Sequence, residues 1–304
     1  LSVGGHKGRR APYAPMLMET SQIDACHLYR NRRDDETEEA FGRRVADQLE
    51  TEILRLGQEN VAAFLAEPVG GATLGCVTPV PGYFARIREI CDKYGVLLIA
   101  DEVMCGMGRT GHFFAIAAEG VCPDIVTVAK GLGAGYQPIG AVLASEKVVT
   151  ALQDGSGKLA NGHTYMSHAV SCAGALAALT AIENEGLIER VRALADELLR
   201  RLTETFGNHR HVGDIRGRGL FYTVELVKDR ATKEPFPASL GLAERIRGEA
   251  MANGLICYPS SGTADGVNGD HVLLAPPFIC SEDDIAEIVR RLSRSVEAAL
   301  AAAA

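Results

Sequence analysis

The sequence of 304 residues lacks several features that mark particular classes of protein. No apolar stretch approaches the roughly 20 residues that a helix needs to span a bilayer. No secretory signal pattern is found at the start of the sequence, so we expect a cytoplasmic protein with no membrane partner. The net charge is −8 and no run is rich in lysine or arginine, which argues against nucleic acid as a partner.

Closely spaced cysteine pairs are also absent. The eight cysteines lie far apart in the sequence and include no C-x-x-C pair. A structural zinc site needs such pairs of cysteine or histidine, so we predict no metal site. We expect the cysteines to be reduced and mostly buried as small hydrophobic residues, as is usual in the cytosol: Cys26, Cys76, Cys91, Cys105, Cys122, Cys172, Cys257 and Cys280.

Apolar runs and amphipathic stretches alternate through the first two thirds of the chain. They predict, in order, helix 36–56, strand 61–66, helix 81–94, strands 96–101, 124–130 and 139–145, and helix 187–206. The strand–helix–strand order is a βαβ unit, which predicts a mostly parallel sheet flanked by helices. The segment 167–183 is nearly all small or apolar and predicts a helix that is buried on most sides.

The pattern changes after Phe206. It predicts a half-buried strand at 219–226, a helix at 240–252, short strands at 255–258 and 271–275, and a last helix that Ser281 caps with Asp284. This mixture is typical of a smaller α+β domain. We therefore predict an α/β protein with a large domain at residues 1–190 and a small C-terminal domain at residues 191–304.

An acid and an amine follow two of the predicted strands. Asp101 ends the apolar run 96–100, and Lys130 ends the run 125–129. In an open α/β sheet the chemistry lies at the carboxyl ends of the strands, so we expect both side chains at one edge of one sheet. Few cofactors need such a pair, and the one that we favour is pyridoxal phosphate (PLP).

The chemistry of PLP explains both residue types. Burial of Lys130 at a strand end would lower the pKa of its ammonium group, and a neutral amine can form a Schiff base with an aldehyde. An aspartate such as Asp101 can keep the pyridine nitrogen protonated, so that the ring accepts electrons. The simpler alternatives are a lysine that extends into solvent and an aspartate paired with an arginine such as Arg109.

A glycine pattern between the two residues suggests another cofactor. Residues 106–111 satisfy G-x-G-x-x-G after a strand, as in dinucleotide-binding folds. Four residues separate Asp101 from the first glycine, however, whereas the dinucleotide pattern needs an immediate turn into a helix. The next acid, Glu119, does not follow a strand. We therefore expect a loop here and not an NAD site.

The motifs together resemble the signature of class III aminotransferases, PLP enzymes of fold type I. The central motifs are Ala100-Asp101-Glu102-Val103, Gly106-Met107-Gly108-Arg109-Thr110-Gly111, Ala129-Lys130-Gly131-Leu132 and Pro138-Ile139-Gly140-Ala141. Flanking motifs extend the likeness over nearly the whole chain: Ala66-Glu67-Pro68, His163-Thr164-Tyr165, Arg216-Gly217-Arg218-Gly219-Leu220 and Ala275-Pro276-Pro277.

The resemblance implies a role for each matching residue. Lys130 would form the Schiff base with PLP and move the proton of the substrate, and Asp101 would pair with the pyridine nitrogen. Val103 would pack on the ring, and Thr164 would reach the phosphate in the neighbouring subunit of a homodimer. The implied reaction transfers an amino group from an amine or ω-amino acid to a 2-oxo acid such as pyruvate.

The sequence departs from the family pattern in three places. An N-terminal portion that normally holds the phosphate is lacking before Leu1, so we expect either a fragment or a truncated chain. Met104 stands where many members have glutamine. No arginine precedes Gly269-Asp270, which argues against a glutamate or 2-oxoglutarate preference unless Arg216 or Arg218, expected in a solvated loop, takes that part.

Two other functions remain open at this point. The same lysine and aspartate serve PLP-dependent racemases and aminomutases, so the motifs do not separate these from a transaminase. A truncated chain without catalytic activity is the third interpretation.

Overall fold

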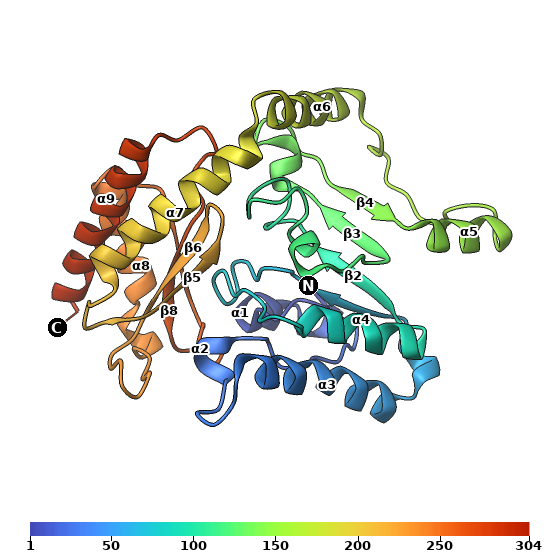
Figure 1. Ribbon diagram of the computed structural model, residues 1–304, viewed down its shortest axis with the longest axis horizontal. Coiled ribbons are helices and arrows are strands. Elements are labelled where there is room, and N and C mark those ends of the chain that lie inside the picture. Colours follow the sequence, from blue (N-terminus) through green and yellow to red (C-terminus); the bar gives the residue numbers. More distant parts are fainter. Residues whose placement is uncertain (304) are drawn as a thin grey trace. The chain divides into compact units, whose positions relative to one another are not determined.

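The computed structural model describes residues 1–303 and divides the chain into two compact units (Figure 1). The central unit consists of Thr37–Pro68 and Val80–Ile188, and the terminal unit of Leu1–Glu36, Val69–Pro79 and Glu189–Ala304. The end of the central unit lies near the predicted boundary at residue 190, whereas the first 36 residues group with the C-terminal part. The division into domains 1–190 and 191–304 stays a prediction.

The central unit contains a four-stranded sheet in the order β1-β2-β3-β4. The strands are β1 (Ala63–Ala66), β2 (Leu97–Asp101), β3 (Ile125–Val128) and β4 (Ala141–Ala144). The pairs β1–β2 and β2–β3 are parallel, and β4 runs antiparallel to β3. The predicted mostly parallel sheet is therefore confirmed.

Two amphipathic helices of the central unit, α3 (Glu38–Leu56) and α4 (Tyr83–Tyr94), pack against each other, and α4 also contacts β2 (Figure 1). The hydroxyl of Thr37 caps α3 by accepting a hydrogen bond from the Ala40 amide, and Gly95 ends α4 in the left-handed conformation. Both helices bury an apolar stripe, made of Phe41, Val45, Leu49 and Ile53 in α3 and of Phe84, Ile87, Ile90 and Cys91 in α4.

The remaining helices of the central unit are α5 (Glu146–Asp154) and α6 (Ala169–Asn184). The prediction that the helix near 167–183 is buried on most sides is wrong, because only Ser171, Ala175 and Ile182 are buried in α6. The helix packs through one narrow face: Ala175 joins a small cluster with Met107, Val128 and Leu132. Within residues 1–303, nothing in the central unit covers its other faces.

The terminal unit is built on an antiparallel sheet in the order β5-β6-β8-β7 (Figure 1). Its elements are α1 (Lys7–Arg10), α2 (Leu28–Asn31), α7 (Leu187–Phe206), β5 (Val212–Arg218), β6 (Phe221–Leu226), α8 (Leu242–Ala252), β7 (Tyr258–Ser261), β8 (Asp270–Leu274) and α9 (Glu282–Ala301). Short 3₁₀ turns complete the chain: η1 (Ala11–Met16), η2 (Gln58–Asn60), η3 (Ala115–Glu119), η4 (Lys130–Gly133) and η5 (Ala238–Leu240). No helix within residues 1–303 is long and apolar enough to span a bilayer.

The core of the terminal unit forms where α7, α8 and α9 bury apolar residues against β6 and β8. The predicted capping box of Ser281 and Asp284 is confirmed at the start of α9. Strand β6 was predicted to be half-buried, but every residue in it is buried. Its second face is covered by early parts of the chain: Glu225 pairs with Arg30, and Gly75 packs on Thr223.

Candidate active site

The structure brings Asp101 and Lys130 to the same edge of the central sheet. Asp101 ends β2 and pairs in register with Thr127 of the parallel strand β3, and Lys130 follows two residues after the end of β3. The carboxyl ends of parallel strands meet at one edge, as the sequence predicts. One carboxylate and one amine therefore belong to the same edge of the sheet.

Asp101 is half-buried and is held by one backbone group. Its Oδ1 accepts a hydrogen bond of 3.0 Å from the amide of Val103, which is itself half-buried. Within residues 1–303 no salt bridge to Asp101 is found, so the alternative of an ion-paired aspartate has no support there. The second carboxylate oxygen is available to a ligand.

Lys130 is exposed, and the prediction that it is buried is wrong for the described residues. It opens the turn η4 with a φ of 45°, in the left-handed region that non-glycine residues seldom adopt. The rest of η4 is anchored, because Leu132 is buried and Gly131 lies close to the Met107 side chain. Such strained backbone recurs at functional sites, and within residues 1–303 the Lys130 ammonium has no hydrogen-bond or salt-bridge partner.

The glycine pattern at residues 106–111 forms successive turns rather than a helix. This agrees with the prediction of a loop and lacks the helix that a dinucleotide site needs. The neighbouring acid, Glu102, was not singled out from the sequence but is 1% exposed. Burial raises the pKa of its carboxyl group, although the amides of Ile116 and Ala115 donate to it and act in the opposite direction. Only its place after a strand-end aspartate could have drawn attention to it.

The donor set at this edge fits PLP. That cofactor needs a carboxylate for its ring nitrogen and an amine for its aldehyde, and Asp101 and Lys130 offer both without competing partners in the described part of the chain. No group of three or more His, Cys, Asp or Glu side chains among residues 1–303 is arranged to hold a metal ion.

Comparison with known proteins gives a consistent answer. The model of the family "Aminotransferase class-III" matches residues 1–296. The chain belongs to the class III aminotransferases. An uncharacterized aminotransferase of Schizosaccharomyces pombe is 46% identical over 303 residues, which are 99% of this chain and 66% of that relative. The chain thus spans slightly less than two thirds of the length of that relative.

Solved structures of transaminases have the same fold. An omega-aminotransferase from Paracoccus denitrificans superimposes with a TM-score of 0.90 at 35% identity, covering 100% of this chain and 66% of that one. A PMP-bound aminotransferase from Vibrio fluvialis gives a TM-score of 0.90 at 36% identity, covering 100% and 65%. This class III aminotransferase chain therefore has fold type I, as predicted, and PLP is the cofactor that its family uses.

Thr164 is exposed in this class III chain. It sits in an exposed turn, closed by a hydrogen bond from the Met166 amide to the His163 carbonyl, and no described hydrogen bond joins it to Asp101 or Lys130. Its predicted contact with the phosphate of a neighbouring subunit stays a prediction. Met104 is half-buried just after Val103.

Arg216 does not lie in a solvated loop, as the sequence suggested, but belongs to β5 of the terminal unit, where its side chain is only 9% exposed. Its guanidinium pairs with Asp214 at 2.8 Å and Glu225 at 2.5 Å, and donates to the carbonyls of Gly75, at 2.6 Å, and Leu74. Four hydrogen bonds engage its guanidinium within the unit, which argues against Arg216 as the group that binds a substrate carboxylate.

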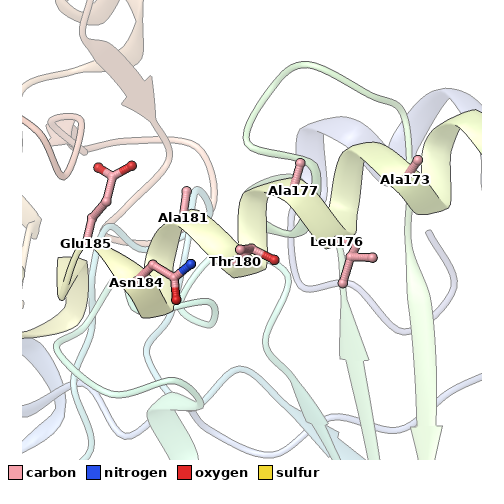
Figure 2. Close-up of a pocket in the computed structure, with 7 residues that line it drawn as sticks. All are labelled: Ala173, Leu176, Ala177, Thr180, Ala181, Asn184 and Glu185. Carbon is pink, nitrogen blue, oxygen red and sulfur yellow. The ribbon is translucent and has the colours of Figure 1, made fainter.

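The helix α6 carries an open groove on its exposed side. Figure 2 shows its lining, which comes entirely from this helix and the residue after it: Ala173, Leu176, Ala177, Thr180, Ala181, Asn184 and Glu185. None of these residues belongs to the Asp101–Lys130 edge, and the lining offers only one ionisable group. The groove is therefore not the candidate active site.

Proposed function

We propose that this chain forms the amine-bearing part of a PLP-dependent transaminase, which transfers an amino group from an amine or ω-amino acid to a 2-oxo acid such as pyruvate. The observation that carries the proposal is the pair of Asp101 and Lys130, which share a sheet edge and have no salt-bridge partner within residues 1–303. Family membership limits the chemistry to amino-group transfer and related reactions.

Each residue has a defined task in this proposal. When bound, PLP supplies a ring that accepts electrons from the substrate α-carbon. Lys130 would hold the cofactor through its aldehyde group, with loss of water, and its Nζ would take and return the proton of the substrate α-carbon. Asp101 would keep a proton on the ring nitrogen, and Val103 would lie beside the ring. Thr164 would hold the phosphate that is bound to the neighbouring subunit.

The substrate class rests on the sequence and on the relatives. Met104 replaces the glutamine of many family members, and no arginine precedes Gly269-Asp270. Arg216, one of the two candidate substitutes, is engaged in ion pairs. These features argue against glutamate as the substrate. The likeness to an omega-aminotransferase supports amines and ω-amino acids instead.

We also propose a homodimer and a cytoplasmic location. Large apolar side chains of the central unit are exposed, including Val142 of β4 and Leu176 of α6 at 69% and 67%, and Tyr165 beside Thr164 at 81%. An exposed apolar surface of this kind favours contact with a partner. None of the eight cysteines forms a disulfide within residues 1–303, which suits a reducing compartment.

Chemical trapping tests the proposal directly. The chain is incubated with PLP and treated with borohydride, and peptides are analysed by mass spectrometry. We expect a covalent phosphopyridoxyl adduct on Lys130 and none in a Lys130→Ala variant. A folded sample without the adduct would contradict the proposal and favour a chain without catalytic activity.

A further inference from the structure

Glu102 is a buried acid for which the proposed reaction has no use. Both carboxylate oxygens are occupied: Oε1 accepts a hydrogen bond of 2.8 Å from the Ile116 amide, and Oε2 accepts one of 2.9 Å from the Ala115 amide. The Cys105 thiol also donates to Oε2, at 3.4 Å. Glu102 therefore ties the end of β2 to the start of the turn η3.

The backbone of Glu102 is fixed as firmly as its side chain. Its amide donates to the Thr127 carbonyl of β3, and its carbonyl accepts a hydrogen bond from the Gly106 amide, both at 2.9 Å. A methyl group on Gly106 would lie 2.7 Å from that carbonyl oxygen and 3.0 Å from the Glu102 Cβ. The turn after β2 thus closes tightly around Glu102 and leaves it no room to shift.

This turn is also what orients Asp101. The Val103 amide, which donates to Asp101 Oδ1 at 3.0 Å, is the next group along the chain after Glu102. The Cys105 thiol, besides contacting Glu102, lies 3.6 Å from the Asp101 carbonyl oxygen. The position of the Asp101 carboxylate therefore depends on a turn that the Glu102 carboxylate holds.

We propose that Glu102 is a positioning residue for Asp101: its buried carboxylate fixes the turn whose Val103 amide orients the Asp101 carboxylate. The use of that orientation for PLP rests on the proposed function, whereas the orientation itself does not. Glutamate suits this task because an ionised carboxylate only accepts hydrogen bonds, and all three groups that face it are donors.

Amide hydrogen exchange without cofactor tests the orientation. Glu102→Gln keeps the size of the side chain but replaces one acceptor with an NH₂ group, so one of the two facing amides loses its partner. We expect exchange of the Val103 amide to accelerate about tenfold or more. If only the Ala115 and Ile116 amides exchange faster and Val103 does not, Glu102 merely supports the fold and the inference is wrong.

Asp270→Asn is the matched control. Asp270 is also a buried carboxylate that accepts a hydrogen bond from an amide at the start of a helix, the Ala243 amide of α8, but it belongs to the terminal unit. The same change of acid to amide there should leave Val103 exchange within about twofold of wild type. Acceleration in this control equal to that in Glu102→Gln would show a general loosening and would overturn the inference.

The affinity for PLP provides the second readout, in a double-mutant cycle. If Glu102 acts through Asp101, Glu102→Gln weakens PLP binding in the wild-type background but not in an Asp101→Asn background. If the double variant weakens PLP binding by the product of the two single factors, the inference is contradicted. Failure of the wild-type chain to bind PLP would instead count against the proposed function, and the exchange result would still decide the role of Glu102.

A milder substitution covers the case in which Glu102→Gln does not fold. Cys105→Ala removes the thiol that donates to Glu102 while leaving the carboxylate in place. Because a thiol is a weak donor, we expect Val103 exchange to rise by about threefold. An unchanged rate at Val103 in this folded variant would count against the inference.

Discussion

Charged side chains stand in opposite situations at the edge of the central sheet and inside the terminal unit. At the edge, Lys130 is exposed and Asp101 accepts one backbone hydrogen bond. In the terminal unit, Glu225 is fully buried and pairs with both Arg30 and Arg216. Satisfied charges stabilise a fold, whereas charges left without partners in a described unit are available for a ligand. This difference distinguishes the candidate active-site residues at the sheet edge from the charged residues that support the fold.

Substitution of Lys130 should have the largest effect on activity, and it tests whether the charges at the sheet edge serve a ligand. Lys130→Ala is expected to abolish transamination, since loss of proton transfer alone costs about 10²–10⁴-fold. The melting temperature should stay unchanged, because the side chain makes no contact that the fold needs. Parallel activity and thermal unfolding measurements check this, and a variant that transaminates at the wild-type rate would exclude Lys130 as the catalytic amine.

Substitution of Arg216 should instead lower the stability of the fold. Arg216→Ala leaves Asp214 and Glu225 without this partner, and breaking a buried ion pair costs about 3–5 kcal/mol of unfolding free energy. Denaturant unfolding measures the loss. Arg200→Ala is the control, because Arg200 pairs with Glu197 and Glu204 on the exposed side of α7 and should matter little. Equal effects of the two substitutions would remove the distinction between a buried network and surface pairs.

Asp270 is an exception to this contrast, since its side chain is buried, at 4% exposure, yet within residues 1–303 its carboxylate accepts a hydrogen bond only from the Ala243 amide. Burial raises the pKa of its carboxyl group from 3.8 to about 6. Below pH 3.8 the carboxyl group is protonated in both the folded and the unfolded protein, so its ionisation costs no folding free energy there. Between pH 3.8 and about 6 the carboxyl group ionises in the unfolded protein but not in the folded one, so the folded protein loses stability as the pH rises. The loss is complete above about pH 6 and is about 3 kcal/mol at most.

Asp270→Asn removes this ionisation while its amide oxygen can still accept the Ala243 hydrogen bond. We expect the variant to be more stable than wild type at pH 7 and nearly equal to it at pH 4, in unfolding experiments across that range. A difference that is constant with pH would show that Asp270 does not titrate as its burial requires.

The sequence was sufficient to predict the elements that depend on local pattern. The strands that end at Asp101 and near Lys130 were predicted from apolar runs, and the parallel character of their sheet from the βαβ order of residues 61–101. The burial of Arg216 and the exposure of Lys130 could not be predicted in this way. They depend on which distant segment covers a given face: residues 1–36 and 69–79 supply partners for Arg216 or Glu225, whereas nothing described in the central unit covers Lys130.

The smallest expected effect concerns α6, which the sequence predicted to be buried. Leu176 is 67% exposed, so Leu176→Ala should change the unfolding free energy by no more than about 0.5 kcal/mol. The same substitution at Leu198, fully buried in α7, should cost about 2–5 kcal/mol. Denaturant unfolding at two protein concentrations checks both. A large, concentration-dependent cost at Leu176 would mean that a second chain covers this face, which would support the proposed homodimer and place α6 within its interface.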